Sequence, residues 1–255
     1  MTRWKVALVL CLAMFACDDQ PAESEQQERT TPLVSNETDG CDNQEAAIDS
    51  GWLDQETELQ ADFDGDGQQD IAHLVLDESG DPGCRAFLVA RTATTEGSEP
   101  VWKKGAEGGL PEPRLNSVVE MNGQPGLEIL VDEISGASTQ FVGAFAFVDS
   151  TLERVEAPES TGDIWSGASE GVFPYGGTVG HIEGADCHDD DGIVVSAALP
   201  AGPAANTYVV ARRFFDVEGA ELVLRDTKRS VATAEEVFDD YPEFRASPFG
   251  SCSSN

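Results

Sequence analysis

The stretch "ADFDGDGQQDIAHLV", Ala61 to Val75, places four aspartates within nine residues and then runs directly into an apolar segment. Counted from the first aspartate, the acids fall at positions one, three, five and nine, as Asp62, Asp64, Asp66 and Asp70. Gly67 at position six permits a sharp turn, and Gln68 at position seven can offer its backbone carbonyl. Alternating carboxylates of this kind wrap one hard cation, and the spacing predicts calcium rather than magnesium, which demands tighter octahedral geometry.

Two other interpretations of this loop are open. An EF-hand needs a bidentate glutamate at position twelve, where this chain has His73, and "IAHLVL" after the loop alternates like a strand. An EF-hand is therefore disfavoured. The second alternative is a solvated acidic turn that binds no ion. With or without an ion, the loop leads into β-structure.

The residues "DFDGDGQQDIAHLV" resemble the loops of FG-GAP or VCBS-type repeats, as in integrin-like β-propellers. The resemblance rests on the DxDxDG core, the acid at position nine and the strand that follows. It implies an all-β, propeller-like fold of four-stranded antiparallel blades. It also implies calcium held by the four aspartate side chains and the Gln68 carbonyl. The chain has room for about three blades, fewer than most propellers have, which leaves ring closure open.

A second segment of the chain repeats the pattern of this loop. "EMNGQPGLEILV" begins at Glu120, 58 residues after Asp62, and places an acid, an amide and an acid at positions one, three and nine. A repeat near 60 residues suits one four-stranded blade. Gln124 and Pro125 replace an acid and a glycine, so this loop is expected to keep its turn without strong metal binding.

A third acidic segment is less regular. "GADCHDDDGIVVSAAL" carries Asp186 and the run Asp189 to Asp191 before an apolar strand. The uneven spacing favours an acidic turn, with a second ion as the alternative.

Apolar alternation over short runs predicts an all-β domain. In "FVGAFAFV", Phe141 to Val148, both faces are apolar, which predicts a strand buried on both sides. One short helix is expected after Thr233, because Thr233 and Glu236 form a capping box. Pro242 is expected to end this helix. The glycine-rich "FPYGGTVGH", 173–181, is expected to be a turn between blades. The predicted strands are IAHLVL, CRAFLVART, LNSVVEM, LEILVDEI, FVGAFAFV, IVVSAAL, TYVVARRFF and ELVLRDTKRSVA.

Residues 1–17 have the composition of a signal peptide: Arg3 and Lys5 precede an apolar run of eleven residues that is too short to span a bilayer. The run ends in "MFAC", which resembles the lipobox of bacterial lipoproteins and implies lipidation of Cys17. Ordinary secretion is the alternative. Residues 18–40 hold seven acids and one cation, which predicts a disordered tether ahead of a β domain at 41–255.

The formal net charge is −33, and a surface this acidic disfavours nucleic acid and anionic lipid as partners. Membrane attachment is therefore expected through the lipid alone. Besides the lipidated Cys17, four cysteines remain after processing, and an even number outside the cytoplasm predicts two disulfides. Three pairings are open, and pairing of sequence neighbours is preferred. The four are Cys41, Cys84, Cys187 and Cys252.

The chain lacks G-x-S-x-G, H-E-x-x-H and any acid pair that stands apart from the general acidity, so no catalytic residue is assigned. These patterns favour a calcium-stabilised, lipid-anchored extracytoplasmic module that binds or scaffolds an unknown envelope protein or glycan. The alternative is a surface glycan-acting hydrolase, or the accessory domain of one. A cleft flanked by two carboxylates at glycosidase separation would favour that alternative.

The N-terminal pattern predicts a modification that can be tested directly. Cleavage before Cys17 with acylation of the new N-terminus should place the protein in the membrane fraction, and Cys17→Ala should release it or leave it unprocessed. Intact-mass spectrometry of the wild type and the variant measures cleavage and acylation. A soluble, unacylated mature wild type would establish plain secretion instead.

Overall fold

The structure is a computed structural model of the 255-residue chain. It describes residues 41, 44, 48, 52–76, 84–101, 113–135, 138–156, 171–188, 192–202, 206–245 and 247–252. The predicted signal peptide, Cys17, the predicted tether and Asp189 to Asp191 lie outside the described residues.

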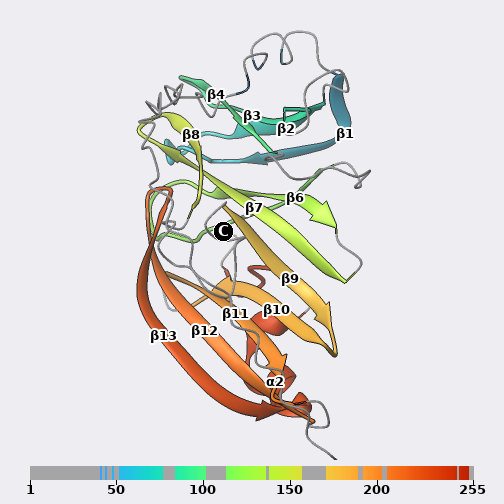
Figure 1. The fold of residues 1–255 in the computed structure, drawn as a ribbon. Helices are drawn as coiled ribbons and strands as arrows, with labels where there is room; N and C mark the ends of the chain where they lie inside the picture. The colour runs from blue at the N-terminus through green and yellow to red at the C-terminus, as the bar shows by residue number, and fades with distance from the viewer. Residues whose placement is uncertain are drawn as a thin grey trace, which may run out of the picture. The chain divides into compact units, whose positions relative to one another are not determined.

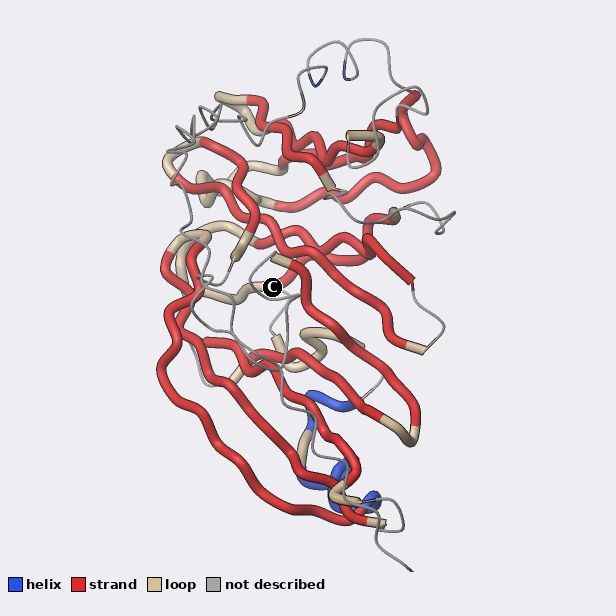
Figure 2. The backbone as a smooth tube through the Cα atoms, in the orientation of Figure 1, coloured by secondary structure: helices blue, strands red, loops and turns tan. Residues whose placement is uncertain are grey.

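The N-terminal part of the domain forms a four-stranded antiparallel sheet in chain order, β1-β2-β3-β4. Its strands are β1 (Trp52–Ala61), β2 (Asp70–Leu76), β3 (Ala86–Arg91) and β4 (Glu96–Pro100). Strands make up most of the described chain (Figure 2), and all eight predicted strands are present. The all-β, antiparallel prediction is therefore confirmed.

The remaining strands form one nine-stranded sheet in the order β13-β12-β11-β10-β9-β7-β6-β5, with β8 also paired to β7. They are β5 (Arg114–Val119), β6 (Glu128–Ser135), β7 (Thr139–Val148), β8 (Thr151–Arg154), β9 (Val172–Thr178), β10 (His181–Cys187), β11 (Gly192–Pro200), β12 (Thr207–Glu218) and β13 (Glu221–Thr233).

The long strand β7 explains why this sheet is continuous. Strand β8 pairs with Phe145–Val148 and strand β9 pairs with Thr139–Gly143, so the two share one edge of β7. The second four-stranded unit, β5 to β8, therefore runs on into β9 to β13 (Figure 1). The described strands form two open sheets and close no ring, so the propeller-like arrangement is not confirmed.

Strand β7 is buried on both faces, as its sequence predicts. Val142, Ala144 and Ala146 pack into one core cluster with Phe173, Phe215 and Leu222 of the nine-stranded sheet. Phe145 faces the other way, into a cluster shared with Leu74 and Leu88 of the four-stranded sheet. The second cluster holds the two sheets together by burial of apolar surface.

The prediction of a turn at 173–181 is wrong. Strand β9 occupies Val172–Thr178, and the turn is limited to Val179 and Gly180. Gly176 and Gly177 adopt positive φ angles of 93° and 123°, which lets the strand bend while it pairs with both β7 and β10. Buried Phe173 and Tyr175 supply the packing that overrides the local glycine signal.

The predicted helix is present as α2 (Ala234–Asp240), followed by the 3-10 turn η3 (Pro242–Phe244). The Thr233 hydroxyl accepts the Glu236 N–H at 3.3 Å, and the Glu236 carboxylate accepts the Thr233 N–H at 2.7 Å. The capping box is therefore confirmed. Buried Glu243 in η3 accepts hydrogen bonds from Arg212 and Ser196, which fastens this segment to the sheet.

Both disulfides join sequence neighbours, as preferred: Cys41 to Cys84 and Cys187 to Cys252. Two such bonds indicate an oxidising compartment outside the cytoplasm.

A buried ion pair ties the end of the four-stranded sheet to the second unit. Arg154 on β8 donates to the Glu133 carboxylate at 2.6 Å, and its side chain is 4% exposed. The same guanidinium donates to the carbonyls of Pro100, the last residue of β4, and of Val101, the next residue. A Cβ at Gly143 would overlap the Glu133 carboxylate, so glycine there makes room for the pair.

Arg154→Ala should destabilise the fold strongly, because it leaves Glu133 charged and buried without its cation. Loss of one partner of a buried pair costs about 3–5 kcal/mol in the free energy of unfolding, measured by urea denaturation. Arg91→Ala is the matched control, since the Arg91–Glu96 pair is exposed and should contribute about 0–1 kcal/mol. Equal effects of the two substitutions on the free energy of unfolding would contradict this role of the buried Arg154–Glu133 pair.

Candidate metal centre and its paired loop

The aspartate loop connects β1 to β2 and is shaped by its own carboxylates. Asp62 accepts the N–H of Gly65 on one oxygen and the N–H of Gly67 on the other, each at 2.8 Å. Both glycines have positive φ angles, 76° and 82°, which the tight wrap around Asp62 requires. The first aspartate therefore organises the turn.

Asp70 opens strand β2 and is the most unusual acid of the loop. Its side chain is 2% exposed, and Oδ2 accepts the N–H of Phe63 at 2.8 Å. Its other oxygen, Oδ1, is buried and has no hydrogen-bond partner. Burial raises the pKa of this carboxyl, the Phe63 N–H opposes that shift, and the nearby charge of Asp64 adds to it.

Three of the predicted ligands come together. Asp62, Asp64 and Asp70 each bring one carboxylate oxygen within 4.8 Å of the others. Asp66 is outside this group: its carboxylate accepts the backbone N–H of Gln68 at 2.6 Å and the Gln68 side-chain amide at 2.8 Å. The cluster thus offers hard oxygen ligands from positions one, three and nine, a donor set that suits calcium.

The loop between β5 and β6 repeats this geometry with different side chains. Met121 donates its N–H to the Glu128 carboxylate at 2.8 Å, as Phe63 does to Asp70. Gln124 donates to the Asn122 side chain at 2.7 Å, in the place of the Asp66 to Asp64 bond. Each loop joins the first two strands of a four-stranded antiparallel unit. The repeat seen in the sequence is therefore also a repeat of local structure.

The two loops contact each other directly. Leu127 donates its N–H to the carbonyl of Asp62 at 3.0 Å. A Cβ at Gly65 would lie 2.5 Å from the Pro125 Cβ, so glycine is needed for this close approach. Beside the contact is a cleft of about 430 Å³, lined by both loops and including Asp62, Glu120 and Gln124.

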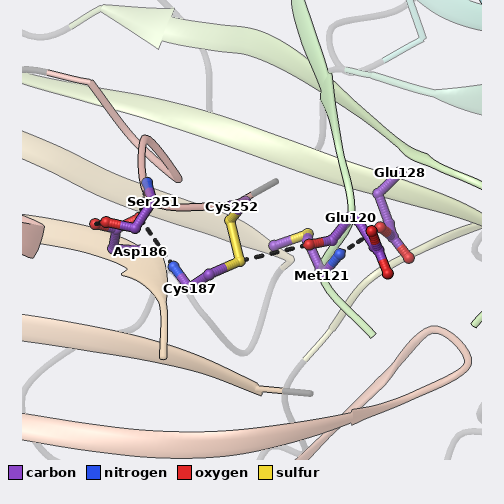
Figure 3. The surroundings of a disulfide bond; sticks show 7 residues. All are labelled: Glu120, Met121, Glu128, Asp186, Cys187, Ser251 and Cys252. Atoms are coloured by element: carbon purple, nitrogen blue, oxygen red, sulfur yellow. Dashed lines mark hydrogen bonds between the residues drawn. A yellow bond between two sulfur atoms is a disulfide. The ribbon is translucent and has the colours of Figure 1, made fainter. Parts of the chain in front are cut away.

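The third acidic segment has a structural role at Asp186. Its carboxylate accepts the N–H groups of Cys187 and Ser251 and the Ser251 hydroxyl, at 2.9, 2.7 and 2.7 Å (Figure 3). The Cys187–Cys252 disulfide lies beside these bonds, and Cys187 Sγ contacts the Glu120 carbonyl at 3.6 Å. Asp186 thus anchors the C-terminal segment.

The histidines are spread through the fold. His73 is buried on β2, where burial lowers its pKa and Arg91 lowers it further. His181 hydrogen-bonds Thr139 at 2.9 Å, and the His188 ring packs against Phe214. On β9 the Tyr175 hydroxyl donates to the Asp132 carboxylate at 3.1 Å, a contact that the sequence did not predict. Its signal was absent, because the two residues are 43 positions apart.

Comparisons of the chain with protein-family models, curated proteins and solved structures find no match. None of the helices in the described part of the chain has the length and apolar character of a membrane span.

Glu128 makes the stability of the domain depend on pH. Burial raises the pKa of its carboxyl from 4.5 to about 7, although the Met121 N–H opposes the shift. Between these values the unfolded chain releases the proton and the folded chain keeps it. The free energy of unfolding should therefore fall by about 3 kcal/mol as pH rises from about 4.5 to 7.

Urea denaturation across this pH range, in chelator, measures the effect as the difference between the wild type and Glu128→Gln. Glu153→Gln, at an exposed position on β8, is the control and should keep the wild-type profile. A Glu128→Gln profile parallel to the wild type would disprove the assignment.

Proposed function

We propose that this chain is a calcium-stabilised binding or scaffold module that works outside the cytoplasm, anchored to the membrane through a lipid on Cys17. Its acidic loop holds calcium as a structural ion. Bound calcium supplies positive charge that offsets the repulsion of the loop carboxylates, and the residues of this chain shape the site.

The unpartnered Oδ1 of Asp70 is the observation that supports the metal most strongly. A buried charged oxygen without a partner costs free energy, and a cation held with Asp62 and Asp64 would remove that cost. Asp62 already wraps the loop around the three carboxylates, so the site needs little rearrangement. The Gln68 carbonyl and Asp66 are the further ligands that the repeat resemblance implies.

The proposed location outside the cytoplasm is supported by two independent features. The disulfides place the domain in an oxidising compartment. The lipobox-like "MFAC" adds the anchor, and the acidic segment that follows is long enough to act as a tether. An envelope protein or glycan is the class of partner that such a displayed domain would meet.

We also propose that the units β1–β4 and β5–β8 are FG-GAP-type repeats in a propeller-like arrangement whose ring is incomplete. The support is local: two loops of the same hydrogen-bond pattern stand between the first two strands of each unit.

Calcium should raise the melting temperature of the chelator-treated mature protein. At 100 times Kd the ion stabilises by about 2.7 kcal/mol, which corresponds to roughly 5–10 °C for a domain of this size. Asp64→Ala with Asp66→Ala should abolish most of that rise. Differential scanning calorimetry measures it, and Asn122→Ala with Gln124→Ala, at the equivalent positions of the second loop, should leave it unchanged.

Asp70→Asn separates a metal site from a mere acidic turn, because its effect should change sign. Without calcium the amide removes a buried charge and should raise the melting temperature, whereas with calcium it should lose the ion-dependent rise. Titration calorimetry that detects no binding at millimolar calcium would leave only an acidic turn.

A further inference from the structure

Strand β13 is an exposed edge of the nine-stranded sheet. It stands last in the strand order, and nine consecutive residues, Val223–Val231, are exposed. Among the described residues, the pairing on its outer side is one parallel bridge between Glu156 and Glu221, at its very start. An edge strand directs alternate N–H and C=O groups outward, where they can pair with a further strand.

This edge is cationic in an acidic chain. Five of the fifteen lysines and arginines lie in the β12–β13 hairpin, and the edge segment Val223–Val231 contains three cations against Asp226 alone. Arg212 and Lys228 stand directly opposite each other across the hairpin. Arg212 pairs with buried Glu243. The exposed Arg225 and Lys228 pair with Asp216 and Asp226. Even so, Val223–Val231 carries two more cations than acids, so this edge is positive against the trend of the molecule. The five lysines and arginines of the hairpin are Arg212, Arg213, Arg225, Lys228 and Arg229.

An apolar row adjoins the cations. Leu199, Val209 and Val231 lie opposite one another across β11, β12 and β13, and are 43%, 39% and 68% exposed. Arg229 precedes Val231 by two positions on the same strand, so it projects from the same face of the sheet. A partner strand with an acidic residue opposite Arg229 and an apolar residue two positions away, opposite Val231, would match both features.

We propose that the β13 edge is a docking site for an acidic, extended segment of a partner protein, which adds to the sheet as a further strand. The inference rests on the binding function proposed above and names its partner, but it does not involve the metal. Edge-to-edge pairing of two copies would place the same cations against each other and is disfavoured. Main-chain hydrogen bonds supply affinity in such strand addition, and the arginines and lysine select the acidic partner.

The test uses the full mature protein and a fluorescent nine-residue peptide, EEVVEEVVE, in which glutamate and valine alternate along each face of the extended strand. Fluorescence anisotropy should show saturable binding that weakens as salt is added. A central proline in the peptide should weaken binding about tenfold, because it removes the backbone donor and the extended pairing. A peptide with lysine in place of glutamate should not bind.

Variants locate the site. The triple substitution R225E/K228E/R229E should weaken binding at least about tenfold. The control R85E/R91E/R114E makes the same change in net charge at exposed positions beside β3, on β3 and on β5, and should stay within about twofold. Circular dichroism should confirm that both variants fold. Hydrogen exchange should show new protection of the Val223–Val231 amides when the peptide is added.

Three results would overturn the proposal. They are no binding at millimolar peptide, equal binding of the proline peptide, and a dimer by light scattering whose β13 amides are already protected without peptide. The last would identify a second copy as the occupant. Because the assay does not depend on calcium, its failure leaves the calcium response, and hence the metal part of the proposed function, separately testable.

Discussion

The centre of this domain depends on one type of hydrogen bond. In each of two loops, a buried carboxylate at position nine accepts the backbone N–H of the residue at position two. Asp70 and Glu128 each make this bond across seven residues, at 2.8 Å. Each bond turns the chain from the first strand of a unit into the second and buries Phe63 or Met121 in a core cluster. The two turns then meet, so the sheets are held by backbone geometry as well as by apolar packing.

The two loops share a backbone and differ in charge. Positions one, three and nine are all acids in the first loop, whereas Asn122 is neutral in the second and burial favours the protonated form of Glu128. The second loop can thus satisfy its interior without a cation, while the first keeps an unpaired oxygen on Asp70. One turn geometry therefore supports both an ion-free joint and a candidate metal centre.

Much of this architecture could be predicted from local pattern. Alternation predicted eight strands and both faces of β7, and the Thr233–Glu236 spacing predicted the capping box, because each is specified within a few residues. Strand β9 was missed because its glycines are typical of a turn, whereas the strand is stabilised by the long-range packing of buried Phe173 and Tyr175. The continuity of the second sheet was also missed, since two strands sharing one edge of β7 leaves no local signal. The acids of the loop were predicted, but the burial of Asp70 depends on tertiary packing. Asp66 leaves the ligand group through local hydrogen bonds with Gln68, which the ligand spacing did not predict.

The disulfides and the proposed calcium loop are consistent with the same compartment. Calcium loops of extracellular modules bind in the range of about 10⁻⁴–10⁻³ M. A centre of three carboxylates, one of them partly used by Gly65 and Gly67, is expected at this weak end, because its ligands already stabilise the loop. Such a site would fill only where calcium is abundant, and the same surroundings allow Cys41–Cys84 and Cys187–Cys252 to persist. Ion and disulfides would then complete the fold only after export.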